Sequence, residues 1–219
     1  MKILEAYPIL LQGAMTTLTI TLTAVFFGLL FGFILAIFRT CGNKFLDTFA
    51  KVYINTFRSI PLIMLLLGAY LVAPGIIKSI TGITSDIRMP TALITFSLFE
   101  AAFFAEIIRS GFNSVATNQN AAAYSLGFNK FQTYLYITMP QAFKNSLPVI
   151  ITQSIILFQD TSLVYVIGLA DFFGTAVKVG ERDGILTQSI IFASCVYLVI
   201  CVSLQRLINK LKGEQLWFQ

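Results

Sequence analysis

Ionisable side chains inside long apolar segments are the groups of this chain with the greatest chemical potential. Glu100 and Glu106 interrupt one apolar run, and Asp160 interrupts the next. Because a charged group in lipid is costly, each carboxyl is a candidate functional group. Arg109 follows Glu106 by three residues, which favours an ion pair within one helix. Glu100 has no comparable partner in its own segment, so a cavity-lining or interhelical role and simple structural pairing are both open.

Amide and hydroxyl groups extend this polar pattern around Asp160. Gln153, Asp160 and Thr161 are spaced i, i+7 and i+8, which places them on one face of a helix. Ser154 lies beside Gln153 in the sequence. Such a stripe predicts either the wall of a polar cavity or hydrogen bonds between packed helices.

The composition excludes several kinds of chemistry. The chain has no histidine, which removes Ser-His-Asp and Cys-His catalysis and the commonest zinc ligand. Cys41, Cys195 and Cys201 lack the spacing of a metal site or a disulfide framework. No Gly-Lys dipeptide occurs, so the chain has no P-loop and any ATP must be handled by another chain. The net charge of +5 comes from scattered basic residues, which argues against a nucleic-acid partner.

Long apolar segments must position these side chains. The hydrophobic fraction is 57% and the charged fraction 11%, whereas soluble domains hold roughly 25% charged residues. The mean hydropathy is +0.81. We therefore predict an all-α integral membrane protein whose 219 residues form one domain of five spans. The predicted spans are residues 16–38, 60–77, 90–108, 147–169 and 185–207, the second being broken near Pro61 and near Pro74-Gly75.

The distribution of Lys and Arg predicts how these spans are oriented. An odd number of spans places the two termini on opposite sides of the membrane. With the C-terminus in the cytoplasm, the inner connections and terminus carry most of the basic residues, as the positive-inside rule requires. We therefore predict the N-terminus outside, the C-terminus inside, and the acid-free connection of residues 111–139 in the cytoplasm.

The connection of residues 111–139 is long for a simple link between two spans. Residues 121–123 are alanines that favour a helix, and Gly127 falls where that helix would end. Aromatic and apolar residues follow at helical spacing and offer a ridge to a partner. The ridge consists of Phe128, Phe131, Tyr134 and Leu135.

The same stretch resembles the cytoplasmic signature loop of ABC-importer permeases. That signature reads Glu-Ala-Ala, three residues, Gly, nine residues, Ile, one residue and Leu-Pro. Its spacings are matched by Ala122, Ala123, Gly127, Ile137 and Pro140, whereas Ala121 replaces the Glu and Met139 the Leu. Other strings resemble the polar amino-acid branch of the family, namely FRSIPL at 57–62, FEAAFFAEIIRSG at 99–111, PQAF at 140–143 and FQDTSLVYVIGLADFF at 158–173. The FQDTSLVYV and GERDG strings are most similar to glutamate/aspartate permease subunits.

This resemblance implies a type I ABC importer permease fold and a division of labour between chains. It implies a second permease chain, identical or related, and an extracytoplasmic amino-acid-binding protein, at a bacterial cytoplasmic (inner) membrane. It also implies a cytoplasmic ATPase subunit that binds ATP and Mg, so this chain is a transporter subunit without a cofactor rather than an enzyme. The residues expected to contact the ATPase are Ala121, Ala122, Ala123, Leu126, Gly127, Phe128 and Phe131.

Substrate chemistry can be matched to the polar residues of the spans. The residues expected along the substrate pathway are Arg58, Glu100, Gln153, Gln159, Asp160, Thr161 and Ser162. The ammonium group of an amino acid requires acceptors such as the carboxylates of Glu100 and Asp160. A dicarboxylic amino acid needs further cations, for which Arg58, Lys178 and Arg182 are available. Many relatives carry Lys where this chain has Gln159, so a cation is not expected at that position.

Other functions remain open from the sequence. An ion-coupled carrier or channel subunit would use the intramembrane acids without ATP. Five spans are few for a carrier with inverted repeats, however, and a carrier has no need of the signature loop. An intramembrane hydrolase is disfavoured because no nucleophile–base pair is evident. Gly28 and Gly32 form a small-xxx-small pair that could bring two helices together.

Overall fold

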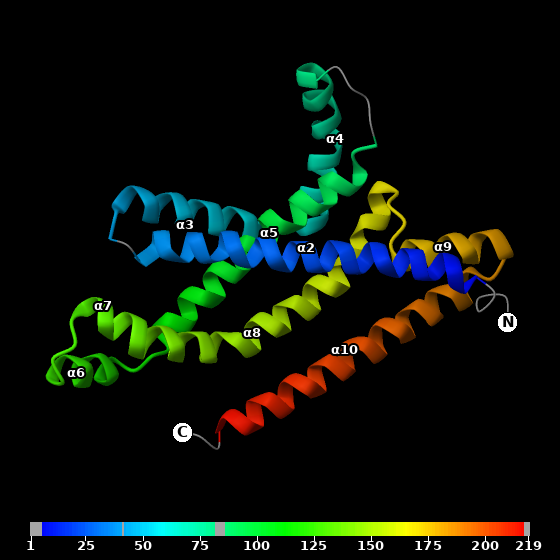
Figure 1. Ribbon diagram of the computed structural model, residues 1–219. Helices are drawn as coiled ribbons and strands as arrows, with labels where there is room; N and C mark the ends of the chain where they lie inside the picture. The colour runs from blue at the N-terminus through cyan, green and yellow to red at the C-terminus, as the bar shows by residue number, and fades with distance from the viewer. Residues whose placement is uncertain (1–5, 41, 82–85, 217–219) are drawn as a thin grey trace.

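The computed structural model describes residues 6–40, 42–81 and 86–216, and every regular element within them is helical (Figure 1). The longest are α2 (Tyr7–Thr40), α5 (Arg88–Asn113), α8 (Met139–Asp160) and α10 (Leu186–Leu216). The shorter helices are α3 (Lys44–Ser59), α4 (Leu62–Thr81), α6 (Thr117–Ser125), α7 (Lys130–Thr133) and α9 (Phe172–Asp183). A π-helix, η1 (Tyr134–Thr138), precedes α8, and a 3-10 helix, η2 (Thr161–Ile167), follows it. The predicted all-α class is therefore confirmed.

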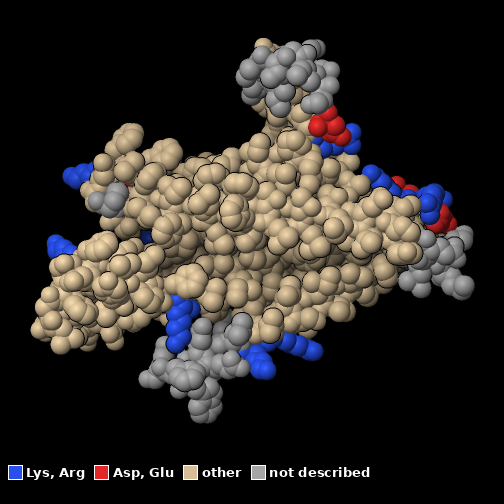
Figure 2. Space-filling model, in the orientation of Figure 1, with Lys and Arg blue, Asp and Glu red and all other residues tan. Residues whose placement is uncertain are grey.

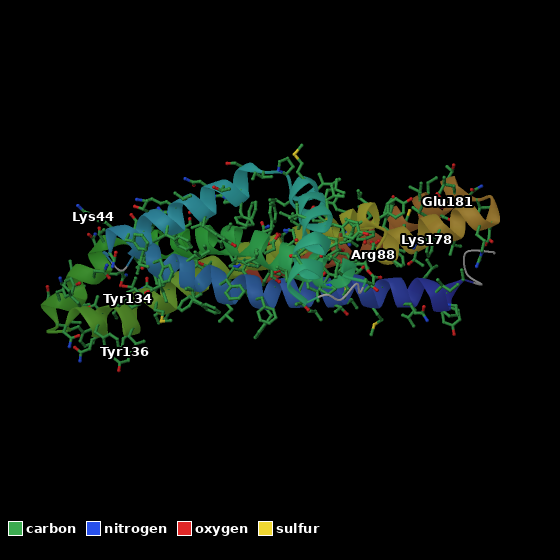
Figure 3. The ribbon with its side chains drawn as sticks, turned by 90° about the horizontal axis from the view of Figure 1, so that it is seen from above. Lys44, Arg88, Tyr134, Tyr136, Lys178 and Glu181 are labelled. Atoms are coloured by element: carbon green, nitrogen blue, oxygen red, sulfur yellow. The ribbon has the colours of Figure 1, made fainter. Side chains whose placement is uncertain are left out.

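The long helices lie lengthwise and give the molecule two distinct ends (Figure 1). The beginning of α3, the α6–α7 tip and the end of α10 lie at one end. The beginning of α2 and helix α9 lie at the other. Figure 3 shows the same separation, with Lys44, Tyr134 and Tyr136 at one end and Lys178 and Glu181 at the other.

Within the residues that the structure describes, four helical segments are long and apolar enough to cross a membrane. They are Tyr7–Thr40, Arg88–Asn113, Lys130–Ile167 and Leu186–Lys210. A fifth candidate is the pair α3 and α4, whose axes differ by 101° across the break at Ile60 and Pro61. Proline cannot continue a helix without losing a hydrogen bond, and it disfavours helical geometry in the residue before it, so the break at this position has a local cause. The structure thus supports four to five spans.

The predicted spans and the observed helices begin and end at different residues. Helix α2 begins well before residue 16, and α3 lies wholly outside the predicted spans. The predicted break near Pro74 is wrong, because Pro74 lies inside α4, which continues to Thr81. The predicted span 147–169 combines the end of α8 with η2, and Gly168, in the left-handed conformation (φ +75°), ends it.

Close packing between α2 and α5 organises the interior. A side-chain Cβ at Gly28 would lie 2.9 Å from Cβ of Glu100, and one at Gly32 would lie 2.9 Å from Cβ of Phe104. The two glycines therefore let the backbones approach where larger residues would separate them. The small-xxx-small pair serves this contact within the chain.

Helix α9 is anchored to the start of α2 through Asp171. Both carboxylate oxygens of Asp171 accept backbone N–H bonds, from Gly174 at 2.9 Å and from Phe173 at 3.1 Å, and so cap the helix. The N–H of Phe172 donates to the hydroxyl of Thr17 on α2 at 3.1 Å. Burial raises the pKa of Asp171 to about 6, and the two backbone bonds offset only part of this effect.

Candidate functional site

A polar cavity of about 420 Å³ lies between α3, α5 and α8. Its polar lining comes from all three helices and consists of Arg58, Glu106, Ser110, Ser114, Asn145, Ser146 and Gln153. Two of the predicted pathway residues, Arg58 and Gln153, therefore meet here although they are far apart in the sequence. A polar cavity between membrane helices fits a hydrophilic solute better than a lipid chain.

Glu100 lies directly behind Gln153. The carboxyl of Glu100 is fully buried, at 0% exposure. The amide of Gln153 donates to both of its oxygens, at 3.3 and 3.2 Å. The Glu100 side chain is thus paired with a residue of another helix. The pair fixes the Gln153 side chain at the wall of the cavity and connects α5 to α8.

The cations around the cavity differ in their surroundings. Glu106 forms the ion pair with Arg109 that the spacing predicted, and the Nε atom of Arg109 donates to it at 3.0 Å. Arg58 instead lies over the ring of Phe103, 5.5 Å from its centroid, in a cation–π contact. Arg58 therefore offers a guanidinium to the cavity without a carboxylate ion pair like that of Arg109.

The predicted stripe of Gln153, Asp160 and Thr161 does not continue along one α-helical face. Helix α8 ends at Asp160, and the tighter 3-10 helix begins at Thr161. Thr161 is fully buried and donates to the carbonyl of Phe158 at 2.7 Å. The cavity lining does not include the four predicted residues Gln159, Asp160, Thr161 and Ser162. Gln159 and Asp160 lie about two turns beyond Gln153 at the end of α8, and Thr161 and Ser162 belong to η2, whose change of helix type the i, i+7, i+8 pattern cannot detect.

The coupling segment, which we define as residues 117–138, forms the α6–α7 tip. Helix α6 ends at Ser125, close to where the sequence predicted, and Gly127, two residues on, has φ +86°. The N–H of Gly127 donates to the carbonyl of Tyr124 at 2.9 Å, and that of Phe128 donates to the carbonyl of Ala123 at 3.1 Å. These two bonds form a Schellman cap, which needs a left-handed residue at its centre.

The predicted ridge is only partly continuous. Asn129 begins α7 with a capping box, in which its side chain and that of Gln132 exchange bonds of 2.9 Å with each other's backbone N–H. Phe128 therefore lies outside the helix that carries Phe131. Six large aromatic or aliphatic side chains of the segment are exposed: Tyr124, Leu126, Phe131, Tyr134, Leu135 and Tyr136.

One contact joins the coupling segment to α5, and a second holds α6 to the end of the segment that continues into α8. The ring of Tyr134 stacks on that of Phe112 at the end of α5, with centroids 5.4 Å apart. The hydroxyl of Thr138 bonds to the side chain of Asn120, at 2.9 Å, and so joins α6 to the residues just before α8. The segment is therefore connected to both α5 and α8, which form walls of the cavity.

Sequence reasoning missed most of the small polar residues at the cavity. Ser110, Ser114 and Asn145 lie at the ends of predicted spans, where polar residues are ordinary. The signal that could have found them is the spacing of Ser110 and Ser114, four residues apart like Glu106 and Ser110. Among the described residues, no group of His, Cys, Asp and Glu side chains could hold a metal ion.

Comparison with known proteins gives a consistent result over nearly the whole chain. Residues 28–212 match the family described as "Binding-protein-dependent transport system inner membrane component". The glutamate/aspartate import permease protein GltK of Escherichia coli O6:H1 is 48% identical over 213 residues, which cover 96% of this chain and 95% of that protein. A putative glutamine transport system permease protein, GlnP of Rickettsia conorii, is 33% identical over 90% of each chain. A solved structure of an amino acid ABC transporter with histidines has a TM-score of 0.88 and 27% identity, and the match covers 97% of this chain and 96% of that one.

Proposed function

Because this chain belongs to the family of binding-protein-dependent transport system inner membrane components, we propose that its amino-acid substrates are glutamate and aspartate. The chain is a multi-pass inner-membrane permease subunit of an amino-acid ABC importer, and it is not the ATPase of that importer. The observation that carries the proposed substrate is the 48% identity with a glutamate/aspartate import permease across 96% of the chain.

The polar cavity is the proposed route of the substrate. A dicarboxylic amino acid carries one carboxylate more than a neutral one, and Arg58 supplies a guanidinium suited to bind it in two-pronged geometry. Gln153, held by Glu100, presents an amide to the same space. We also assign to the pathway Gln159, Asp160, Thr161 and Ser162, which follow Gln153 along α8 and η2 beyond the cavity lining.

The proposed partner at the coupling segment is the ATPase subunit, which binds ATP and Mg. Family membership implies an ATPase and a binding protein. The exposed ridge of the segment supports ATPase docking there, because apolar side chains on a short helix fit a groove on a partner. A second permease chain, identical or related, completes the proposed pathway opposite this one.

The proposed orientation places the coupling segment and the C-terminus in the cytoplasm. Figure 2 supports it, because only Lys and Arg are visible among the charged residues at the α6 end and near the end of α10. The acidic residues visible in that view lie near α9 and near the beginning of α5, together with further basic ones. A surplus of basic residues at one end is what the positive-inside rule expects of the cytoplasmic side.

Reconstitution tests the proposed substrate. The permease is inserted into liposomes with its ATPase and binding protein, and ATP-dependent uptake of labelled glutamate is competed by aspartate, glutamine and arginine. Competition by aspartate alone is expected. Equal competition by glutamine would refute a dicarboxylic preference. Uptake driven by a proton or sodium gradient without ATP would instead support the alternative of an ion-coupled carrier, for which family membership gives no support.

A matched pair of substitutions tests the route. Arg58→Gln removes the cation that lines the cavity, whereas Lys44→Gln removes an exposed cation from the other end of α3. A lost charge-assisted bond of about 1.5–3 kcal/mol corresponds to roughly 10- to 100-fold slower glutamate uptake for Arg58→Gln. Lys44→Gln is expected to transport normally. Equal uptake by both variants would remove Arg58 from the pathway.

A further inference from the structure

A second cavity lies on the other side of α5 and α8 from the polar one. This apolar groove, of about 320 Å³, runs between α2, α5 and α8. Leu29 and Phe33 of α2 and Ile108 and Phe112 of α5 form two of its walls. On α5 the polar cavity is instead lined by Ile107 and Ser110, which point away from Ile108 and Phe112.

The surroundings of the groove determine what can fill it. Its lining is almost wholly apolar, so water inside it would lack hydrogen-bond partners. Its walls belong to three helices that are each long and apolar enough to span a membrane. Phe33 and Phe143 at its edge are 36% and 63% exposed, and exposed apolar side chains of this kind face lipid in a membrane protein.

We propose that the groove between α2, α5 and α8 binds one acyl chain of a membrane phospholipid. A saturated chain is flexible and narrow enough for a channel of this volume, and it gains dispersion contacts with the lining side chains. Because Phe112, Met139 and Phe143 lie at the end of the groove nearest the coupling segment, the lipid comes from the leaflet on that side.

The charge at this end selects the headgroup. Lys144 directly follows Phe143 on α8, about 100° around the helix from it, and its exposed, flexible side chain can carry an ammonium to the membrane surface beside the groove. The described residues visible here in Figure 2 carry positive charge without acidic neighbours on that face. An anionic lipid such as phosphatidylglycerol is therefore bound more tightly than a zwitterionic one.

The acyl chain acts on the substrate pathway through Ser146. Ser146 lines both the apolar groove and the polar cavity. Gly111 lies so close to it that an added Cβ would overlap its hydroxyl and would lie 2.8 Å from the carbonyl of Ala142. The groove thus borders a close contact between α5 and α8, and filling it supports that contact from the side away from the substrate.

Filling the groove with a side chain tests the proposal. Leu29→Trp places a large ring in the groove, whereas Leu30→Trp places the same ring on the neighbouring residue, which is 46% exposed and does not line it. The complete transporter is purified in detergent with phosphatidylglycerol or phosphatidylethanolamine, and native mass spectrometry counts the retained lipids. Thermal unfolding with increasing phosphatidylglycerol measures binding independently, because a ligand of the folded state raises the midpoint.

The expected result separates the two variants. The natural chain and Leu30→Trp retain one lipid per permease chain, with phosphatidylglycerol favoured, and their midpoints rise with added lipid. Leu29→Trp folds, assembles, loses at least about tenfold in retained lipid and shows no such rise. Equal retention by both variants, or none by the natural chain, overturns the proposal. A disulfide between a cysteine placed at Phe143 and a second permease chain, in a background without other cysteines, would assign the groove to protein and likewise overturn it.

Discussion

Replacing Gly127 isolates the effect of backbone conformation in the coupling segment. Gly127 has φ +86°, and a Cβ added there would meet no atom within 4 Å. The cost of Gly127→Ala is therefore conformational strain, not steric overlap, and it amounts to about 1–2 kcal/mol for a left-handed alanine. That strain opposes the bonds from Gly127 and Phe128 that end α6.

The strain translates into weaker coupling to the ATPase. If docking requires the ordered cap, a strain of about 1–2 kcal/mol lowers the affinity of the segment by up to roughly 5–30-fold. ATP hydrolysis should then continue with fewer substrate molecules imported per ATP. The ratio of uptake to hydrolysis in proteoliposomes measures this, and hydrogen exchange at the amide of Phe128 reports the loosened cap.

Gly42 provides the matched control. It has φ +77°, also with open space around an added Cβ, but it lies between α2 and α3. Gly42→Ala therefore carries similar strain outside the coupling segment, and Gly127→Asn keeps a residue that tolerates the left-handed conformation. An unchanged ratio in Gly127→Ala, or an equal fall in Gly42→Ala, would refute the role given to the cap.

Three further tests, two of them with a compensating second substitution, have defined outcomes. Gln153→Leu leaves the buried carboxyl of Glu100 unpaired and should lower the stability of the folded chain by about 1–3 kcal/mol. Adding Glu100→Leu removes that unpaired group and should recover much of the lost thermal unfolding midpoint. A double variant with no recovery would contradict the pairing. Gly111→Ala should lower that midpoint through overlap with Ser146, and Ser146→Ala should restore part of it, so an unaffected single variant would contradict the close crossing. Asp171 has a pKa raised from 3.8 to about 6, so the folded chain binds this proton more tightly than the unfolded one, and stability present below about pH 4 is lost as the pH rises to about 6. Asp171→Asn should remove roughly 3 kcal/mol of that pH dependence, and identical unfolding profiles between pH 4 and 6 would disprove the shift.

The apolar runs predicted the long helices because hydropathy measures how favourably a segment of side chains transfers into lipid. Helix α3 was missed, since Lys44, Asp47 and Lys51 interrupt its apolar residues. Asp47 lies between two cations, 3.0 Å from Nε of Arg39 and 2.6 Å from Nζ of Lys51, and this arrangement depends on the turn after α2. The pattern of apolar and polar residues along the sequence does not show that Arg39 and Asp47 lie side by side.

The coupling segment and the polar cavity differed in how far the sequence predicted them. The end of α6 depends on local chemistry, so Gly127 in the sequence was enough to place it. The partner of Glu100 lies 53 residues away on another helix. Only the packing of α5 on α8 brings Gln153 to it, and the sequence contains several other amides that could have served. Local signals were therefore reliable, and pairings between helices were not.

The close contact of α5 and α8 at Gly111 and Ser146 divides α8 into a short arm and a long arm. At 1.5 Å per residue, α8 extends about 20 Å from Ser146 toward Asp160 but only about 10 Å back to Met139. A displacement delivered to the short arm is thus roughly doubled at the far end of the long one.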